Sequence, residues 1–226
     1  MPPTQPPKPR AIIFDLLTAL LDSWTAWDLA ASTALAQTGQ PRSASLGRAW
    51  RARYLQLTYG AGAYTSYAGL VRAAAAATPG LPAPLAADLL LANYVAWIAP
   101  WPDAAPTLAR LKDAGYLLAV ATNCSVELGH EAAGLCGEGV FDAVVTAEES
   151  GWYKPAKGAY EAVLRDLGCE AGEALFVAGS AADVPGAAAA GMRVVWHNRV
   201  GLEAVGEVRA EREGRTLEEV LEGIVL

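Results

Sequence analysis

Several features that the sequence lacks narrow the classes of protein it can encode. Its three cysteines form an odd set without C-x-x-C or mixed Cys/His spacing, which argues against a disulfide scaffold or structural zinc and favours a reducing compartment. Basic residues are not in excess, since the net charge is −7 and the pI is about 4.9, whereas a nucleic-acid partner needs a basic face. No stretch reaches about 18 uninterrupted apolar residues, so no transmembrane helix is expected. We therefore expect a cytoplasmic protein whose partners include neither nucleic acid nor membrane.

The chain also lacks the apolar run of a signal peptide at its start, MPPTQPPKPR, which is rich in proline. This composition predicts a disordered lead-in over residues 1–8. Apolar residues are plentiful elsewhere, at 53% of the sequence, so there is ample material for a buried core. A length of 226 residues suits one core domain with an insertion better than two independent domains.

Short β-prone runs alternate with helical patterns through most of the chain. Segments with apolar residues at helical spacing, most of them ending in glycine, separate the expected strands. Those strands are AIIF (11–14), YLLAVAT (116–122), DAVVT (142–146), ALFVAG (174–179) and RVVWHN (193–198). The alternation predicts an α/β fold, in which helices cover both faces of a parallel sheet.

One region interrupts this alternation. Residues 25–98 contain no convincing strand and carry only helical or alanine-rich patterns. They follow the first strand directly, and the turn-forming segment APWPDAAP marks the return to alternating elements. We expect an α/β core formed by residues 9–24 and 99–226, with residues 25–98 inserted as an all-helical cap.

Polar residues gather where the expected strands end. Asp15 follows the first strand, Thr122 and Asn123 follow the second, Lys154 lies in the loop after DAVVT, and Ser180 and Asp183 follow ALFVAG. Each has a structural explanation when taken alone: a helix cap, a turn or a solvated charge. Ligands of open parallel sheets, however, bind at the carboxyl ends of the strands. The presence of all these polar residues at one edge of the expected sheet favours an active site there.

The chemistry of such a cluster follows from its residue types. A carboxylate at a rigid strand end, Asp15, next to a lysine that favours its ionised form, is equipped for covalent nucleophilic catalysis. Asn123 can orient a substrate or hold a leaving anion. Asp183 can balance the charge of Lys154 or assist the attack of water on an intermediate.

The same residues carry a resemblance to the haloacid dehalogenase superfamily. Its four motifs appear in order as IIFD with Asp15, VATN with Thr122 and Asn123, YKPAKGAY with Lys154, and FVAGSAAD with Asp183. The pattern extends from residue 11 to about residue 199. The resemblance implies a Rossmann-like core with a cap inserted after the first motif.

Two positions favour one branch of the superfamily. Phosphatases of this kind carry Asp-x-Asp, whose second Asp protonates the leaving alcohol, and an acid in the fourth motif that binds magnesium; here these places hold Leu17 and Ser180. A halide leaving group needs neither a proton nor a metal. The chain is most similar to the L-2-haloacid dehalogenases, which implies that Asp15 displaces the leaving group at C2 of a small 2-substituted carboxylic acid. Water would then hydrolyse the ester, assisted by Lys154 and Asp183, without a cofactor.

The resemblance also implies residues that bind the substrate or its leaving group. The segment AWRAR matches a Trp-Arg pair whose arginine, here Arg51, receives the carboxylate and the halide. YTSY suggests Tyr67 as a pocket wall, and YKPAKGAY places Tyr160 six residues after the lysine. Arg51 could instead be a surface cation, and Tyr67 could be part of the core. The remaining expected binding residues are Thr18, Thr122, Asn123 and Ser180.

Departures from the family pattern leave the substrate open. Where the family has Gly-Thr after the nucleophile, this chain has Thr18-Ala19, and Ser180 stands where the family has an amide side chain. Ala182 replaces the family's aromatic residue just before Asp183, a change that should open the pocket. Relatives that open an azetidine carboxylate ring use the same attack on a non-halogenated acid.

Two alternatives stay open. One is a phosphatase in which Asp15, the Leu17 carbonyl and Asp183 bind Mg²⁺. The other is a catalytically silent binding protein with the same fold. The expected partner is a small carboxylate substrate. The sequence also leaves open whether the protein forms a homodimer.

Overall fold

A six-stranded parallel sheet forms the centre of the molecule in the computed structural model, which describes residues 7–226. The predicted lead-in thus lies outside the described residues except for its last two positions. The strand order is β3-β2-β1-β4-β5-β6, with every neighbouring pair parallel. The strands are β1 (Ala11–Phe14), β2 (Leu117–Thr122), β3 (Ala143–Thr146), β4 (Ala174–Ala178), β5 (Arg193–His197) and β6 (Arg212–Gly214). The predicted parallel α/β sheet is confirmed, and β6 is an edge strand that the sequence did not predict.

Helices cover both faces of the sheet because its central strands are apolar on both sides. In β1, Ile12 and Phe14 face one hydrophobic core, whereas Ala11 and Ile13 face the other. The second core is closed by α8 (Lys157–Leu167) and α9 (Asp183–Ala189), and the first by α5 (Ala104–Asp113), α6 (Val126–Gly134) and α10 (Leu217–Leu221). All four residues of β1 are fully buried, as expected for a central strand of a parallel sheet.

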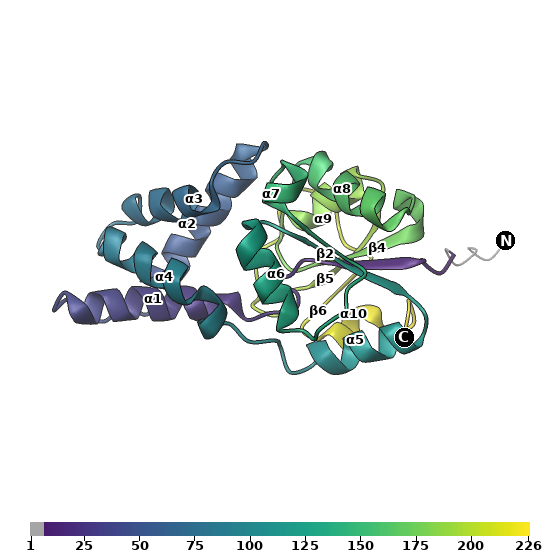
Figure 1. The fold of residues 1–226 in the computed structure, drawn as a ribbon, viewed down its shortest axis with the longest axis horizontal. Coiled ribbons are helices and arrows are strands. Elements are labelled where there is room, and N and C mark those ends of the chain that lie inside the picture. The colour runs from purple at the N-terminus through teal and green to yellow at the C-terminus, as the bar shows by residue number, and fades with distance from the viewer. Residues whose placement is uncertain (1–6) are drawn as a thin grey trace.

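Four helices stand between β1 and α5 and pack on one another at one end of the sheet (Figure 1). They are α1 (Ser23–Gln37), α2 (Leu46–Ala61), α3 (Tyr67–Ala76) and α4 (Ala83–Trp97), and we call them the helical insertion. Trp27 and Trp50 are buried at its centre, with ring centroids 4.6 Å apart. The remaining short helices of the sheet region are α7 (Ala147–Ser150) and the 3-10 turn η1 (Ala171–Glu173). None of the helices in residues 7–226 combines the length and the apolar character needed to cross a membrane.

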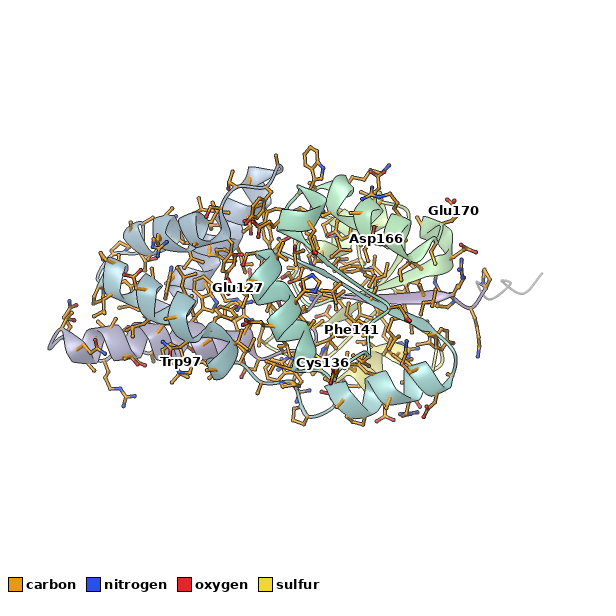
Figure 2. All side chains as sticks on the ribbon, viewed as in Figure 1. Trp97, Glu127, Cys136, Phe141, Asp166 and Glu170 are labelled. Atoms are coloured by element: carbon orange, nitrogen blue, oxygen red, sulfur yellow. The ribbon has the colours of Figure 1, made fainter. Side chains whose placement is uncertain are left out.

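The helical insertion is tied to the sheet region at two places. Where the chain enters and leaves it, the Asp22 N–H donates to the Ala99 carbonyl at 2.8 Å and the Trp101 N–H donates to the Leu20 carbonyl at 2.9 Å. On another side, the Tyr64 N–H donates to the Gly151 carbonyl at 2.8 Å. Figure 2 also shows Glu127 of α6 on the side that faces the insertion. These contacts hold the insertion over the end of the sheet at which Asp15 lies.

Candidate active site

A small cavity of about 30 Å³ lies between the carboxyl ends of the strands and the helical insertion. Ala182, expected to open the pocket, is not among the residues that line it. The lining residues are Asp15, Leu17, Thr18, Arg51, Tyr54, Leu55, Tyr59, Tyr94, Thr122, Asn123, Lys154, Ser180 and Asp183.

Asp15, Lys154 and Asp183 form one buried ionic cluster in this cavity. The Lys154 ammonium donates to Asp15 Oδ1 at 2.8 Å and to Asp183 Oδ2 at 3.0 Å. Their exposed fractions are 4%, 3% and 2%, respectively. A buried charge is costly unless it is paired, and here one cation is shared by two anions. The structure therefore brings together the three residues that the sequence placed at the ends of separate strands.

This sharing leaves the two carboxylates with different proton affinities. Burial raises the pKa of Asp183 to about 6; the charge of Lys154 opposes the rise, and the charge of Asp15 adds to it. Burial by itself would lower the pKa of Lys154, but the charges of Asp15 and Asp183 outweigh it and raise that pKa. The ammonium thus stays charged at neutral pH, and Asp183 is a carboxylate that accepts a proton near neutrality.

Two residues behind the cluster fix its orientation. The Tyr160 hydroxyl donates to Asp183 Oδ1 at 2.8 Å, so each oxygen of that carboxylate has one partner. Asn123 Oδ1 accepts from the Lys154 N–H at 2.7 Å, and Asn123 Nδ2 donates to the Lys154 carbonyl at 2.9 Å. Tyr160 therefore acts on the site from outside the cavity, whereas Asn123 both lines the cavity and holds the lysine backbone.

Asp15 is held by backbone groups on its other side. Its Oδ2 accepts from the Thr18 N–H at 3.1 Å. Gly179, at the end of β4, passes close to this oxygen: a Cβ there would lie 2.7 Å from Asp15 Oδ2 and 2.3 Å from the Ala19 N atom. Any larger residue at position 179 would displace the carboxylate or its loop. The glycine is thus required by close approach of the two chain segments.

Arg51 brings a second cation to the cavity from α2. The sequence left open that it was a surface residue, but its exposed fraction is only 4%. Its Nη1 donates to Ser23 Oγ at 2.5 Å, and its guanidinium carbon lies 4.3 Å from the centroid of the Trp24 ring. Its Nε is buried without a hydrogen-bond partner. An unpaired N–H on a buried guanidinium is suited to an anionic ligand.

Three tyrosines that the sequence analysis did not identify as site residues also line the cavity: Tyr54, Tyr59 and Tyr94. Tyr54 donates its hydroxyl to the Asn123 carbonyl at 2.8 Å. Tyr59 belongs to a series of α2 residues at intervals of four, formed by Arg51, Leu55 and Tyr59. This spacing places the three side chains on one face of the helix. Once Arg51 was assigned to the pocket, this spacing could have identified Tyr59 as a pocket residue from the sequence.

The other predicted binding residues divide into two groups. Thr18, Thr122 and Ser180 line the cavity beside the ionic cluster, as the sequence predicted. Tyr67 does not line it. Its ring packs edge-on against Tyr54, at 5.7 Å between centroids, and lines a separate groove of about 1030 Å³ between the insertion and α6.

Several oxygen atoms that a Mg²⁺ site would use already have partners within the protein. The Leu17 carbonyl, which the phosphatase alternative requires as a ligand, accepts a hydrogen bond from the Ser23 hydroxyl. One oxygen of Asp15 and one of Asp183 are bound to the Lys154 ammonium. Over residues 7–226, no three His, Cys, Asp or Glu side chains are grouped in a way that could hold a metal ion. A hard divalent cation binds several oxygen ligands, and the phosphatase alternative would have to take them from these partnered oxygens.

Comparison with known proteins decides the family. The sequence model of the haloacid dehalogenase-like hydrolases matches residues 9–191. The chain belongs to this family of hydrolases.

The relatives of this hydrolase include both a dehalogenase and a phosphatase. Haloacetate dehalogenase H-2 of Moraxella sp. (strain B) is 35% identical over 103 residues, which cover 45% of this chain and 46% of the relative. Phosphatase MT3486 of Mycobacterium tuberculosis (strain CDC 1551 / Oshkosh) is 32% identical over 124 residues, covering 54% and 57%. These matches span about half the length of each curated relative.

A solved structure matches over a greater length. The L-2-haloacid dehalogenase RSc1362 superposes with a TM-score of 0.83 at 25% identity, covering 96% of this chain and 99% of that one. The haloacid dehalogenase-like fold expected from the motifs is thus shown over nearly the whole chain.

Proposed function

We propose that this hydrolase cleaves the bond between C2 and a leaving group in a small 2-haloacid, with Asp15 as the covalent nucleophile. The observation that carries the proposal is the placement of Asp15. It is a buried carboxylate, paired with Lys154 and lining a cavity to which Arg51 brings an unpaired N–H. A carboxylate substrate bound to Arg51 would thereby be held beside the nucleophile.

In the first step, an oxygen of Asp15 attacks C2 and forms an ester. The bond between C2 and the halogen breaks, and the halide leaves with its electron pair. Leu17 stands where a proton-donating acid would be needed for an alkoxide leaving group, and a halide requires no such proton. The small size of the cavity favours a short acid over a longer one.

In the second step, water hydrolyses the ester and restores Asp15. Asp183 is the group suited to accept a proton from that water, because it lies in the same cavity and its pKa is raised to about 6 by burial. Lys154 compensates the charge that returns to Asp15. The product is a 2-hydroxy acid.

We propose that the reaction needs no cofactor, since the Leu17 carbonyl and the two carboxylates are occupied within the protein. The helical insertion then serves as a cap that closes the site from solvent. The free thiols of Cys124, Cys136 and Cys169 agree with a cytoplasmic location. A small carboxylate is the partner that this reaction requires.

The test compares chloroacetate with p-nitrophenyl phosphate, each with EDTA and with added Mg²⁺. The proposal expects chloride release that EDTA leaves unchanged, and no comparable phosphatase activity. Phosphate release that depends on Mg²⁺, without chloride release, would establish the phosphatase alternative, for which a phosphatase among the relatives is the supporting observation. Activity on neither substrate class would favour the silent binding protein.

A further inference from the structure

Tyr59 is a polar residue of the cavity that the proposed reaction does not yet use. It projects from α2, is half-buried, and lines the cavity together with Ser180 and Asp183. Burial raises the pKa of Tyr59 to about 12, and the charge of Asp183 adds to the rise. The phenol is therefore a neutral hydrogen-bonding group at neutral pH.

The helical insertion thus brings two different polar groups, Arg51 and Tyr59, to the cavity that contains Asp15. Arg51 contacts Ser23, whose hydroxyl donates to the carbonyl of Leu17. Tyr59, eight positions later on the same helix, lines the cavity together with Ser180 and Asp183. Arg51 supplies a cation suited to the substrate anion, and Tyr59 supplies a neutral hydroxyl suited to holding a water molecule.

The groups around Asp183 show what a water molecule there would need. A well-ordered buried water makes about three hydrogen bonds. Each oxygen of Asp183 already has one partner, Lys154 or Tyr160, and a carboxylate oxygen can accept a second hydrogen bond. Ser180 and Tyr59 line the same cavity as this carboxylate, and each carries a hydroxyl that can hydrogen-bond to a water molecule.

We propose that Tyr59 is a positioning residue for the second half of the reaction: with Ser180, it holds the water that attacks the Asp15 ester. This role rests on the proposed covalent mechanism. One proton of the water passes to Asp183, and the oxygen joins the carbonyl carbon of Asp15. The bond from that carbon to the product oxygen then breaks, and the product oxygen takes the proton that Asp183 holds, which restores Asp183. Asp15 returns to a carboxylate as the second proton of the water leaves to solvent. Tyr59 orients the water and transfers no proton.

The test separates the two half-reactions in Tyr59→Phe, which removes only the hydroxyl. Rapid mixing with chloroacetate should show the first equivalent of chloride released at the wild-type rate, followed by steady turnover slower by roughly 10-fold to 100-fold, the scale of a misplaced reactant. The Asp15 ester should then accumulate and be visible by mass spectrometry. Tyr64→Phe is the matched control, since its ring stacks on Tyr153 outside this cavity, and it should match the wild type.

A second variant tests whether the two hydroxyls act on the same water. Ser180→Ala should produce the same split, and the double variant should cost less than the product of the two single effects. Equal slowing of chloride release and turnover in Tyr59→Phe, or no slowing of either, would overturn the role of Tyr59. Absence of chloride release by the wild-type protein would instead overturn the proposed function, and the role of Tyr59 with it.

Discussion

Asn123 holds the backbone of Lys154 from both sides, with hydrogen bonds of 2.7 Å to its N–H and 2.9 Å to its carbonyl. The two residues are 31 positions apart and follow different strands, β2 and β3. The Asn123 carbonyl in turn accepts from Tyr54 of the helical insertion. Asn123 thus connects the insertion to the loop that carries the lysine, which makes it a positioning residue for the ionic cluster.

Asn123→Ala should lower kcat by about 10-fold to 100-fold, because the Lys154 ammonium would no longer be fixed between the two carboxylates. The free energy of unfolding should fall by about 1–3 kcal/mol, the cost of leaving buried backbone groups without their partners. Steady-state kinetics with chloroacetate and urea titration measure the two effects. Asn93→Ala is the control, because Asn93 bonds only to the Leu89 carbonyl of its own helix. Unchanged kinetics in Asn123→Ala would show that Lys154 is positioned without the two hydrogen bonds from the Asn123 side chain.

Arg51→Lys should raise KM for chloroacetate about 10-fold or more while changing kcat less. Lysine keeps the positive charge, but it lacks the planar set of N–H groups with which Arg51 can bind Ser23 and a carboxylate together. The exposed Arg53 of the same helix supplies the control, Arg53→Lys, for which no change is expected. If Arg51→Lys lowered the melting temperature strongly and left KM unchanged, Arg51 would be structural.

The pH dependence of turnover should show an acid limb below pH 6 but above the range of an ordinary aspartate. Burial raises the pKa of Asp183 to about 6 in the free protein, and formation of the Asp15 ester removes a charge that adds to this rise. The Asp183 carboxylate therefore takes up a proton as the pH falls through this range and can no longer accept one from water. The rate of ester hydrolysis should therefore be full above this range and decline below it. A profile of kcat from pH 4.5 to pH 8.5 measures the limb. A limb near pH 4, the range of an ordinary aspartate, would contradict the assignment of Asp183 as the base.

The parts of the fold and site that follow from local sequence patterns could be predicted. The apolar runs of β1 to β5 mark buried parallel strands, and residues at the carboxyl ends of such strands meet at one edge, which placed Asp15, Lys154 and Asp183 together. The edge strand β6 could not be found in this way, because its residues Arg-Glu-Gly are polar and two of them are exposed. Its position depends on backbone pairing with β5.

The contribution of the helical insertion could not be predicted to the same degree. Which residues of a helix reach the cavity depends on how the insertion docks over the sheet, through contacts between distant segments such as Tyr64 and Gly151. Tyr59 was therefore missed, and Tyr67, which was expected to be a pocket wall, packs against Tyr54 and does not line the cavity. Arg51 was placed correctly in the cavity only through a family resemblance.

The most direct test of the account is a single turnover of chloroacetate in H₂¹⁸O with enzyme in excess. If Asp15 is the nucleophile, its own unlabelled oxygen enters the product glycolate, and the label appears in the Asp15 carboxylate. In Asp15→Asn the neutral amide is a poor nucleophile, and turnover should fall by several orders of magnitude, on the scale of about 10⁶-fold for loss of a nucleophile elsewhere. Label found at once in glycolate, with none in Asp15, would mean that water attacks C2 directly and would contradict the covalent mechanism.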